Sequence, residues 1–128
     1  MGRGRRVDLG TVTTEEMATV SAFVHLVRSG PGIKQGVAVL CRDGVRVWQI
    51  ADKDAHVEIR GEAASFDEVL HCPVHLVYTV RDLCQMGDPV HLAYEDRRIT
   101  ASAPTGEVSL VAGPGRTHDS PVHDAASV

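Results

Sequence analysis

Apolar and polar residues alternate through the stretch GVAVLCRDGVRVWQIADKDAHVEIRG, residues 36–61. A period of two places successive side chains on opposite faces of a strand, so this stretch predicts strands rather than helix. Asp43-Gly44 is a two-residue hairpin signal, and ADKD at 51–54 supplies a second turn. We therefore expect an antiparallel meander over 37–42, 45–50 and 55–61, with one face buried and the other in water.

A helical period precedes the meander. Met17, Val20, Val24 and Val27 recur at i, i+3, i+7 and i+10, which is one apolar helix face, and Phe23 and Leu26 widen it. Thr13 followed three residues later by Glu16 predicts an N-cap and capping box. Because SGPG at 29–32 does not continue a helix, we expect a single amphipathic helix over roughly 14–29.

The second half of the chain has a similar order of patterns. The segment EAASFDEVLHCP is irregular and predicts a loop, with room for one helical turn. After it we expect a strand, a short helix, and then three strands joined by turns at Asp96-Arg97 and PTG. These elements are predicted at 74–79 (strand), 79–88 (helix), 89–96, 98–103 and 107–113 (strands).

With a short strand at 7–11, each half reads as strand, helix and three strands. The predicted fold class is α+β: one domain in which two helices pack on antiparallel sheets with a pseudo-two-fold repeat. Residues 1–6 are predicted to be a basic flexible arm and 7–112 the folded domain. Residues 113–128 are rich in Gly, Pro, Ser and Asp without periodicity, so we expect a disordered tail.

Composition agrees with a folded domain, because 43% of the 128 residues are apolar and 23% charged. No apolar run approaches the roughly 18 residues of a membrane span, and no signal peptide follows the basic start, so we expect a cytoplasmic protein. The net charge is −4; without the three arginines of residues 1–6, 10 basic and 17 acidic residues leave −7. This balance argues against nucleic-acid binding over the whole surface, but not against a basic arm.

Candidate chemistry is sparse. Three cysteines without repeated spacing do not indicate disulfides, so we expect reduced thiols. The histidines and cysteines of residues 71–91 could form a zinc site or a thiol nucleophile, or they could be ordinary strand residues. Neighbours on a strand point to opposite faces, which favours ordinary strand residues. We therefore predict no catalytic residue, metal or cofactor. The residues considered are His71, Cys72, His75, Cys84 and His91 for zinc, and Cys72, His71, His75 and Asp67 for the nucleophile.

The order of elements and several local strings resemble one domain of the DNA sliding clamp family, which includes the bacterial DNA polymerase III beta subunit. The similarity covers about residues 7–112. It lies in VDLGTVTTEEMATVSAFVHLV, in the hairpin and third strand GVAVLCRDGVRVWQIADKDAHVEI, and in CPVHLVYTVRDLCQMGDPVHLAYEDRRITASAPTGEVSLVA. Family chains carry two or three such domains and close rings of six, whereas this sequence shows one.

The resemblance implies a non-enzymatic protein that self-assembles through edge strands, associates with duplex DNA and tethers a partner such as a polymerase or another DNA-processing or regulatory protein. A clamp-fold interaction module that does not encircle DNA is the alternative. The family's helices face the DNA, and basic residues near them are the expected contacts. The expected DNA-facing residues are Arg3, Arg5, Arg6, His25, Arg28 and Arg81.

Overall fold

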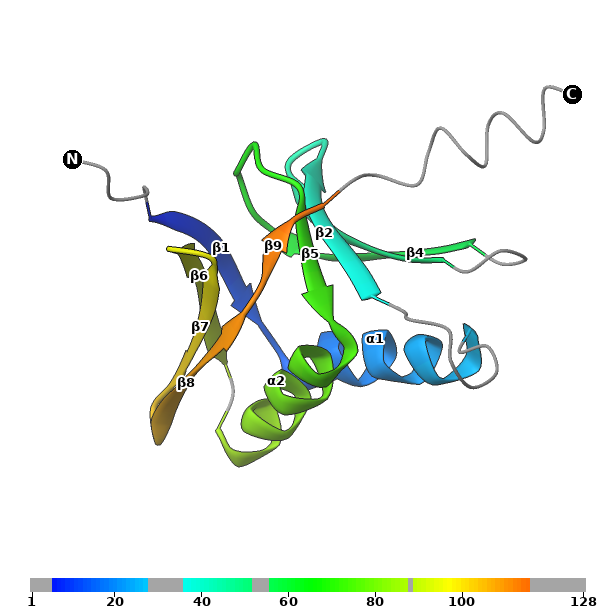
Figure 1. The fold of residues 1–128 in the computed structure, drawn as a ribbon. Coiled ribbons are helices and arrows are strands. Elements are labelled where there is room, and N and C mark those ends of the chain that lie inside the picture. The colour runs from blue at the N-terminus through cyan, green and yellow to red at the C-terminus, as the bar shows by residue number, and fades with distance from the viewer. Residues whose placement is uncertain (1–5, 28–35, 52–55, 88, 116–128) are drawn as a thin grey trace, which may run out of the picture.

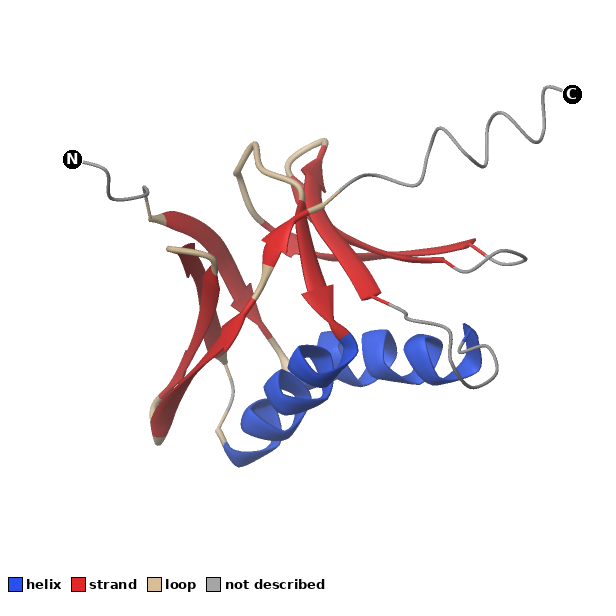
Figure 2. Cartoon of the chain, viewed as in Figure 1, coloured by secondary structure: helices blue, strands red, loops and turns tan. Residues whose placement is uncertain are grey.

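The computed structural model describes residues 6–27, 36–51, 56–87 and 89–115. Both helices lie together on one side of the molecule and two antiparallel sheets on the other (Figures 1 and 2). This is the α+β architecture predicted from the sequence. The elements, in order, are β1 (Val7–Val12), α1 (Thr14–Val27), β2 (Gly36–Arg42), β3 (Val45–Ala51), β4 (His56–Ala63), β5 (Leu70–Pro73), α2 (Val74–Met86), β6 (Val90–Glu95), β7 (Arg98–Ala103), β8 (Gly106–Val111) and β9 (Gly113–Pro114).

The two halves exchange their first strands. One sheet has the order β1-β6-β7-β8 and the other β4-β3-β2-β5-β9, so β1 pairs with the second half and β5 with the first. All of these pairings are antiparallel. The predicted repeat of strand, helix and three strands is therefore present, and the exchange joins both halves around one core.

Helix α1 begins as predicted. The backbone N–H of Glu16 donates to Thr13 Oγ1 at 3.3 Å, and Met17, Val20 and Val24 are fully buried. The capping-box prediction is wrong in its second half, because the Glu16 side chain turns into the interior instead of reaching back to Thr13. The predicted end of this helix near residue 29 lies outside the described residues.

The largest difference from the sequence prediction lies at residues 70–79. The predicted loop contains strand β5, and the predicted strand at 74–79 is the first half of helix α2, with Pro73 at its N-cap. Leu76, Val77, Val80 and Cys84 are buried and repeat at helical spacing. The run VHLVYT alternates too briefly to separate strand from helix, and packing against α1 decides for helix.

The prediction of one wet face for the meander is also wrong for its central strands. Every residue from Arg46 to Ile50 is buried, as are those from Val37 to Leu40. Strand β3 lies between β4 and β2 in its sheet. Gln49, on the outer face of β3, donates to Glu58 at 2.7 Å. Glu58 also pairs with Arg42 at 2.8 Å, so polar side chains are joined across this outer face.

The described residues extend past the predicted domain boundary at 112. Gly113 and Pro114 form β9 and pair with His71 and Leu70 of β5, so the predicted tail begins with a short strand. Residues 116–128 of the predicted tail and residues 1–5 of the predicted arm at 1–6 lie outside the described residues. None of the described helices is long and apolar enough to cross a membrane.

Candidate assembly edges and helical surface

Each sheet ends in one long edge strand and one edge that is short or distorted. Strand β4 has 8 residues and β8 has 6, and neither contains proline. Strand β9 has only 2 residues and includes Pro114, which has no N–H to donate. In Figure 1, β4 and β8 lie on opposite sides of the molecule. Unpaired backbone groups along a long edge are a template for another strand, so β4 and β8 are the candidate assembly edges.

Strand β1 is distorted where its register with β6 shifts between Asp8 and Gly10. Gly10 has a φ of 87°, a left-handed conformation that glycine adopts without strain. Its N–H donates to Asp8 Oδ1 at 2.9 Å, and the same oxygen lies 2.7 Å from His91 Nε2. These two bonds, the Gly10 amide first, lower the pKa of the Asp8 carboxyl. The bend interrupts β1 as a docking edge.

A buried ion pair lies between the two sheets. Arg46, with no exposed surface, donates from Nε and one terminal nitrogen to the two carboxylate oxygens of Glu16, at 3.0 and 2.7 Å. The guanidinium also donates to the Leu9 carbonyl at 2.7 Å and to the Thr11 carbonyl. Trp48 Nε1 donates to Glu16 at 2.6 Å. The network therefore ties β1 and α1 to β3, and the buried charges are paired and hydrogen-bonded.

Two glycines make room for this network. A Cβ on Gly61 would overlap the Glu16 carboxylate, and a Cβ on Gly10 would stand 2.8 Å from an Arg46 nitrogen. The register of β3 with β4 steps from Val47↔Arg60 to Val45↔Ala63, so Arg46 opposes two residues of β4, a bulge. The Glu62 N–H of that bulge donates to Glu16 at 3.4 Å.

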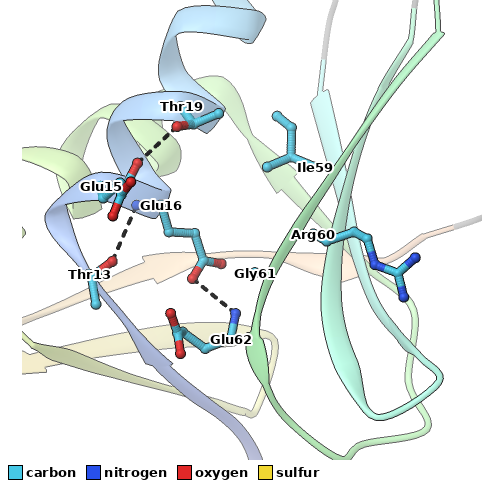
Figure 3. A pocket seen from close by; sticks show the side chains of 8 residues that line it. All are labelled: Thr13, Glu15, Glu16, Thr19, Ile59, Arg60, Gly61 and Glu62. Carbon is cyan, nitrogen blue, oxygen red and sulfur yellow. Dashed lines mark hydrogen bonds between the residues drawn. The ribbon is translucent and has the colours of Figure 1, made fainter.

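Beside this bulge lies a shallow hollow between the start of α1 and the end of β4 (Figure 3). Its acidic side chains come from Glu15, Glu16 and Glu62, whereas the Arg60 side chain points away from it. Glu16 is already engaged by Arg46, so the hollow is the outer side of the buried pair. Because the Arg60 side chain points away from the hollow, its charge lies on the outer surface along the open edge of β4.

The helical surface carries little charge. Apart from buried Glu16 and the histidines, the described residues of α1 and α2 include the charged residues Glu15, Arg81 and Asp82, a net charge of −1. Arg81 is engaged, because it pairs with Asp82 at 3.0 Å and lies 5.0 Å over the Tyr78 ring. The remaining exposed residues include no acid, lysine or arginine: Ala18, Thr19, Ala22, Phe23, His25 and Leu26 of α1, and His75, Gln85 and Met86 of α2.

The expected DNA-facing residues are spread over the molecule. Thr14 Oγ1 donates to the Cys84 carbonyl, which places the start of α1 beside the end of α2, near Arg81. His25 is exposed close to the other end of α1. Arg6 precedes β1, and the far end of that strand leads into α1. Arg3, Arg5 and Arg28 lie outside the described residues, so no basic cluster forms among the described members of the set.

The residues weighed for zinc and for nucleophilic chemistry do not converge in the described part of the chain. There, no group of three or more His, Cys, Asp or Glu side chains is arranged to hold a metal ion. On β5, His71 is exposed whereas Cys72 is fully buried. Burial raises the pKa of the Cys72 thiol to about 12, which keeps it protonated and unreactive at neutral pH.

Sequence reasoning missed the roles of Glu16 and Arg46. The alternation of β3 places Arg46 on the same face as Trp48 and Ile50, and a charged residue on an apolar face is a signal for a buried partner. The partner lies 30 residues earlier, at a helix start where a glutamate has an ordinary capping role. The pattern of one strand therefore indicates that Arg46 is unusual without identifying Glu16.

Comparison with known proteins identifies the fold. No protein-family model matches the sequence, and no curated protein matches it. Among solved structures, the DNA polymerase III beta-subunit sliding clamp (DnaN) of Bartonella birtlesii, solved bound to griselimycin, superposes with a TM-score of 0.65 at 16% identity. The match covers 86% of this chain and 30% of that clamp chain. The chain thus has the fold of a single sliding-clamp-like domain, as the sequence resemblance implied.

Proposed function

We propose that the protein is a sliding-clamp-like, non-enzymatic module that self-assembles through its edge strands, associates with duplex DNA and tethers a partner protein. The observation that carries the proposal is the pair of long open edges, β4 and β8, on a clamp-like domain that corresponds to 30% of a DNA clamp chain. The two edges differ, so copies join head to tail, and such contacts close into a ring when the rotation per copy allows it.

The low charge of the helical surface determines how the protein would hold DNA in this proposal. With a net charge of −1 on the described helix residues apart from buried Glu16 and the histidines, these helices offer no strong attraction for phosphates. Encirclement does not need such attraction, because a closed ring retains DNA by topology. The arm residues Arg3, Arg5 and Arg6 would then supply the electrostatic contacts, together with His25, Arg28 and Arg81 where these face the duplex.

The low charge of the helical surface also supports a second candidate function. A clamp-fold interaction module that does not encircle DNA needs no basic interior, and it would use the edges for a partner or for a dimer. Mass in solution separates the two: six copies of the 13.8 kDa chain support the ring, whereas a monomer or dimer supports the module.

Retention on DNA then tests encirclement. We expect the assembly to stay on covalently closed circular duplex DNA and to slide off the same DNA after linearisation. An R3S/R5S/R6S variant should still be retained on circles. Its weak binding to linear DNA should depend less on salt, with the slope of log K against log salt smaller by about 2 to 3. Equal retention on circles and linear DNA would contradict the ring.

A further inference from the structure

The exposed side chains along the two candidate edges have complementary charges in one alignment. Strand β4 presents Glu58 and Arg60 to solvent, and β8 presents Glu107 and Ser109. Glu58 is already paired with Arg42 and bonded to Gln49, whereas Arg60 has no ion pair or hydrogen bond within the described residues. The exposed, unpaired cation of β4 is therefore Arg60.

The open part of β4 ends at the bulge. Beyond Arg60 the Glu62 N–H turns to Glu16, and the Ala63 carbonyl oxygen lies 3.5 Å from a Cβ built on Gly10 of β1. A docked strand therefore has the residues before the bulge available to it. That stretch, residues 56–61, is as long as the 6-residue strand β8.

We propose that a second copy of this chain docks its β8 antiparallel on β4 in the register that places Glu107 opposite Arg60. This inference rests on the proposed function, whose edge pairing it specifies residue by residue. The register aligns the start of β8 with the bulge of β4. Its pairs are Gly61↔Gly106, Arg60↔Glu107, Ile59↔Val108, Glu58↔Ser109, Val57↔Leu110 and His56↔Val111.

Both faces of the joined sheet agree with this register. Val57 and Ile59 lie on the core face of β4, and Val108 and Leu110 are half-buried on the core face of β8. Placing them opposite each other continues the apolar layer from one copy to the next. On the outer face, Arg60 meets Glu107 while the already paired Glu58 meets Ser109. Cross-strand pairs of opposite charge stabilise a sheet and like charges opposite each other destabilise it.

Neighbouring registers are worse on the same criteria. A shift by one residue turns Val108 and Leu110 of β8 to the outer face. A shift by two in one direction sets Glu107 opposite Glu58. A shift by two in the other direction sets Glu107 opposite Glu62 and requires pairing through the bulge. The charges and the bulge together select one register.

Charge reversal tests the contact without disturbing the interior, because Arg60 and Glu107 are both exposed. Either R60E or E107R alone sets like charges opposite each other at every junction, and we expect each junction to weaken about tenfold or more. An equal mixture of the two variants should assemble again, since copies that alternate around the assembly place opposite charges across every junction. The double variant R60E/E107R should assemble alone, because it exchanges the two charges and keeps them opposite.

Sedimentation velocity over a concentration series measures how many copies assemble in each variant and in the mixture. D82R, at an exposed acid of helix α2 and therefore on neither candidate edge, is the matched charge-reversal control and should assemble like the unmodified protein. Loss of assembly in both single variants with recovery in the mixture supports the register. Normal assembly of R60E and E107R, or no recovery in the mixture, overturns the register while the proposed function stands. An unmodified protein that stays monomeric at every concentration overturns both.

Discussion

Arg46 and Glu16 lie 30 residues apart in the chain and form a two-point ion pair in its interior, where their side chains are 0% and 5% exposed. Removing one partner of such a pair leaves the other charge buried without compensation. The pair joins helix α1 to strand β3 and, through two carbonyls of β1, reaches the other sheet. The junction of the two sheets is therefore held by polar contacts as well as by the apolar core.

The first prediction concerns the stability that depends on this pair. R46M should lower the free energy of unfolding by about 3–5 kcal/mol, because the Glu16 carboxylate then stays buried and keeps, among the described residues, only Trp48 and the Glu62 N–H as donors. Urea unfolding followed by circular dichroism measures the loss. The double variant E16Q/R46M should lose less than the sum of the single losses, since it buries no unpaired charge.

R81A is the matched control for this prediction. Arg81 also pairs with an adjacent acid, Asp82, but the two side chains are 32% and 61% exposed. An exposed pair of this kind contributes at most about 1 kcal/mol. If R46M lost no more than R81A, the buried pair would not be the stabilising feature described here.

The second prediction concerns the space that Gly61 leaves for Glu16. G61A should cost about 1–3 kcal/mol, because the new methyl group overlaps the carboxylate and the bulge must shift to admit it. The matched control is G106A on β8, where an added Cβ meets nothing within 4 Å. Thermal or urea unfolding compares the two, and equal stabilities would show that the bulge yields without cost.

The sequence predicted most strands and the first helix because their periods are long and bounded by clear turns. Asp43-Gly44 and Asp96-Arg97 turn as expected, and the central residues apart from Gly44 adopt φ values of 56–63° that such tight turns require. The prediction failed at residues 74–79, where a short apolar alternation fits a strand and a helix equally well. There the contact with α1 decides, and that contact is not visible in local pattern.

The candidate edges were predictable only in part. An antiparallel meander implies edge strands, but which edges stay open depends on the bend at Gly10, the bulge opposite Arg46 and the pairing of β9 with β5. Each of these depends on residues distant in sequence. The buried Arg46 shows the same limit, since alternation marks its face as apolar and only the fold brings Glu16 to it.

The third prediction concerns the pH dependence of stability. Burial raises the pKa of Cys72 to about 12, so the folded chain keeps this proton at pH values where the unfolded chain releases it. The contribution of the neutral thiol is complete below the ordinary thiol pKa near 9 and is lost as the pH rises towards 12. Between these limits one proton separates the two states, which is about 1.4 kcal/mol per pH unit.

C72A isolates this contribution, because alanine removes the titrating group and leaves other alkaline titrations unchanged. We expect the difference in unfolding free energy between the unmodified protein and C72A to be constant up to about pH 9 and to shrink above it. Urea unfolding at steps from about pH 7 to 11 measures this difference. Cys41 is the matched control: its pKa is also raised by burial, but its side chain is partly exposed, so C41A should change the pH profile less. Parallel profiles for the unmodified protein and C72A would show that Cys72 reaches solvent in the folded state and is not enclosed in the apolar core.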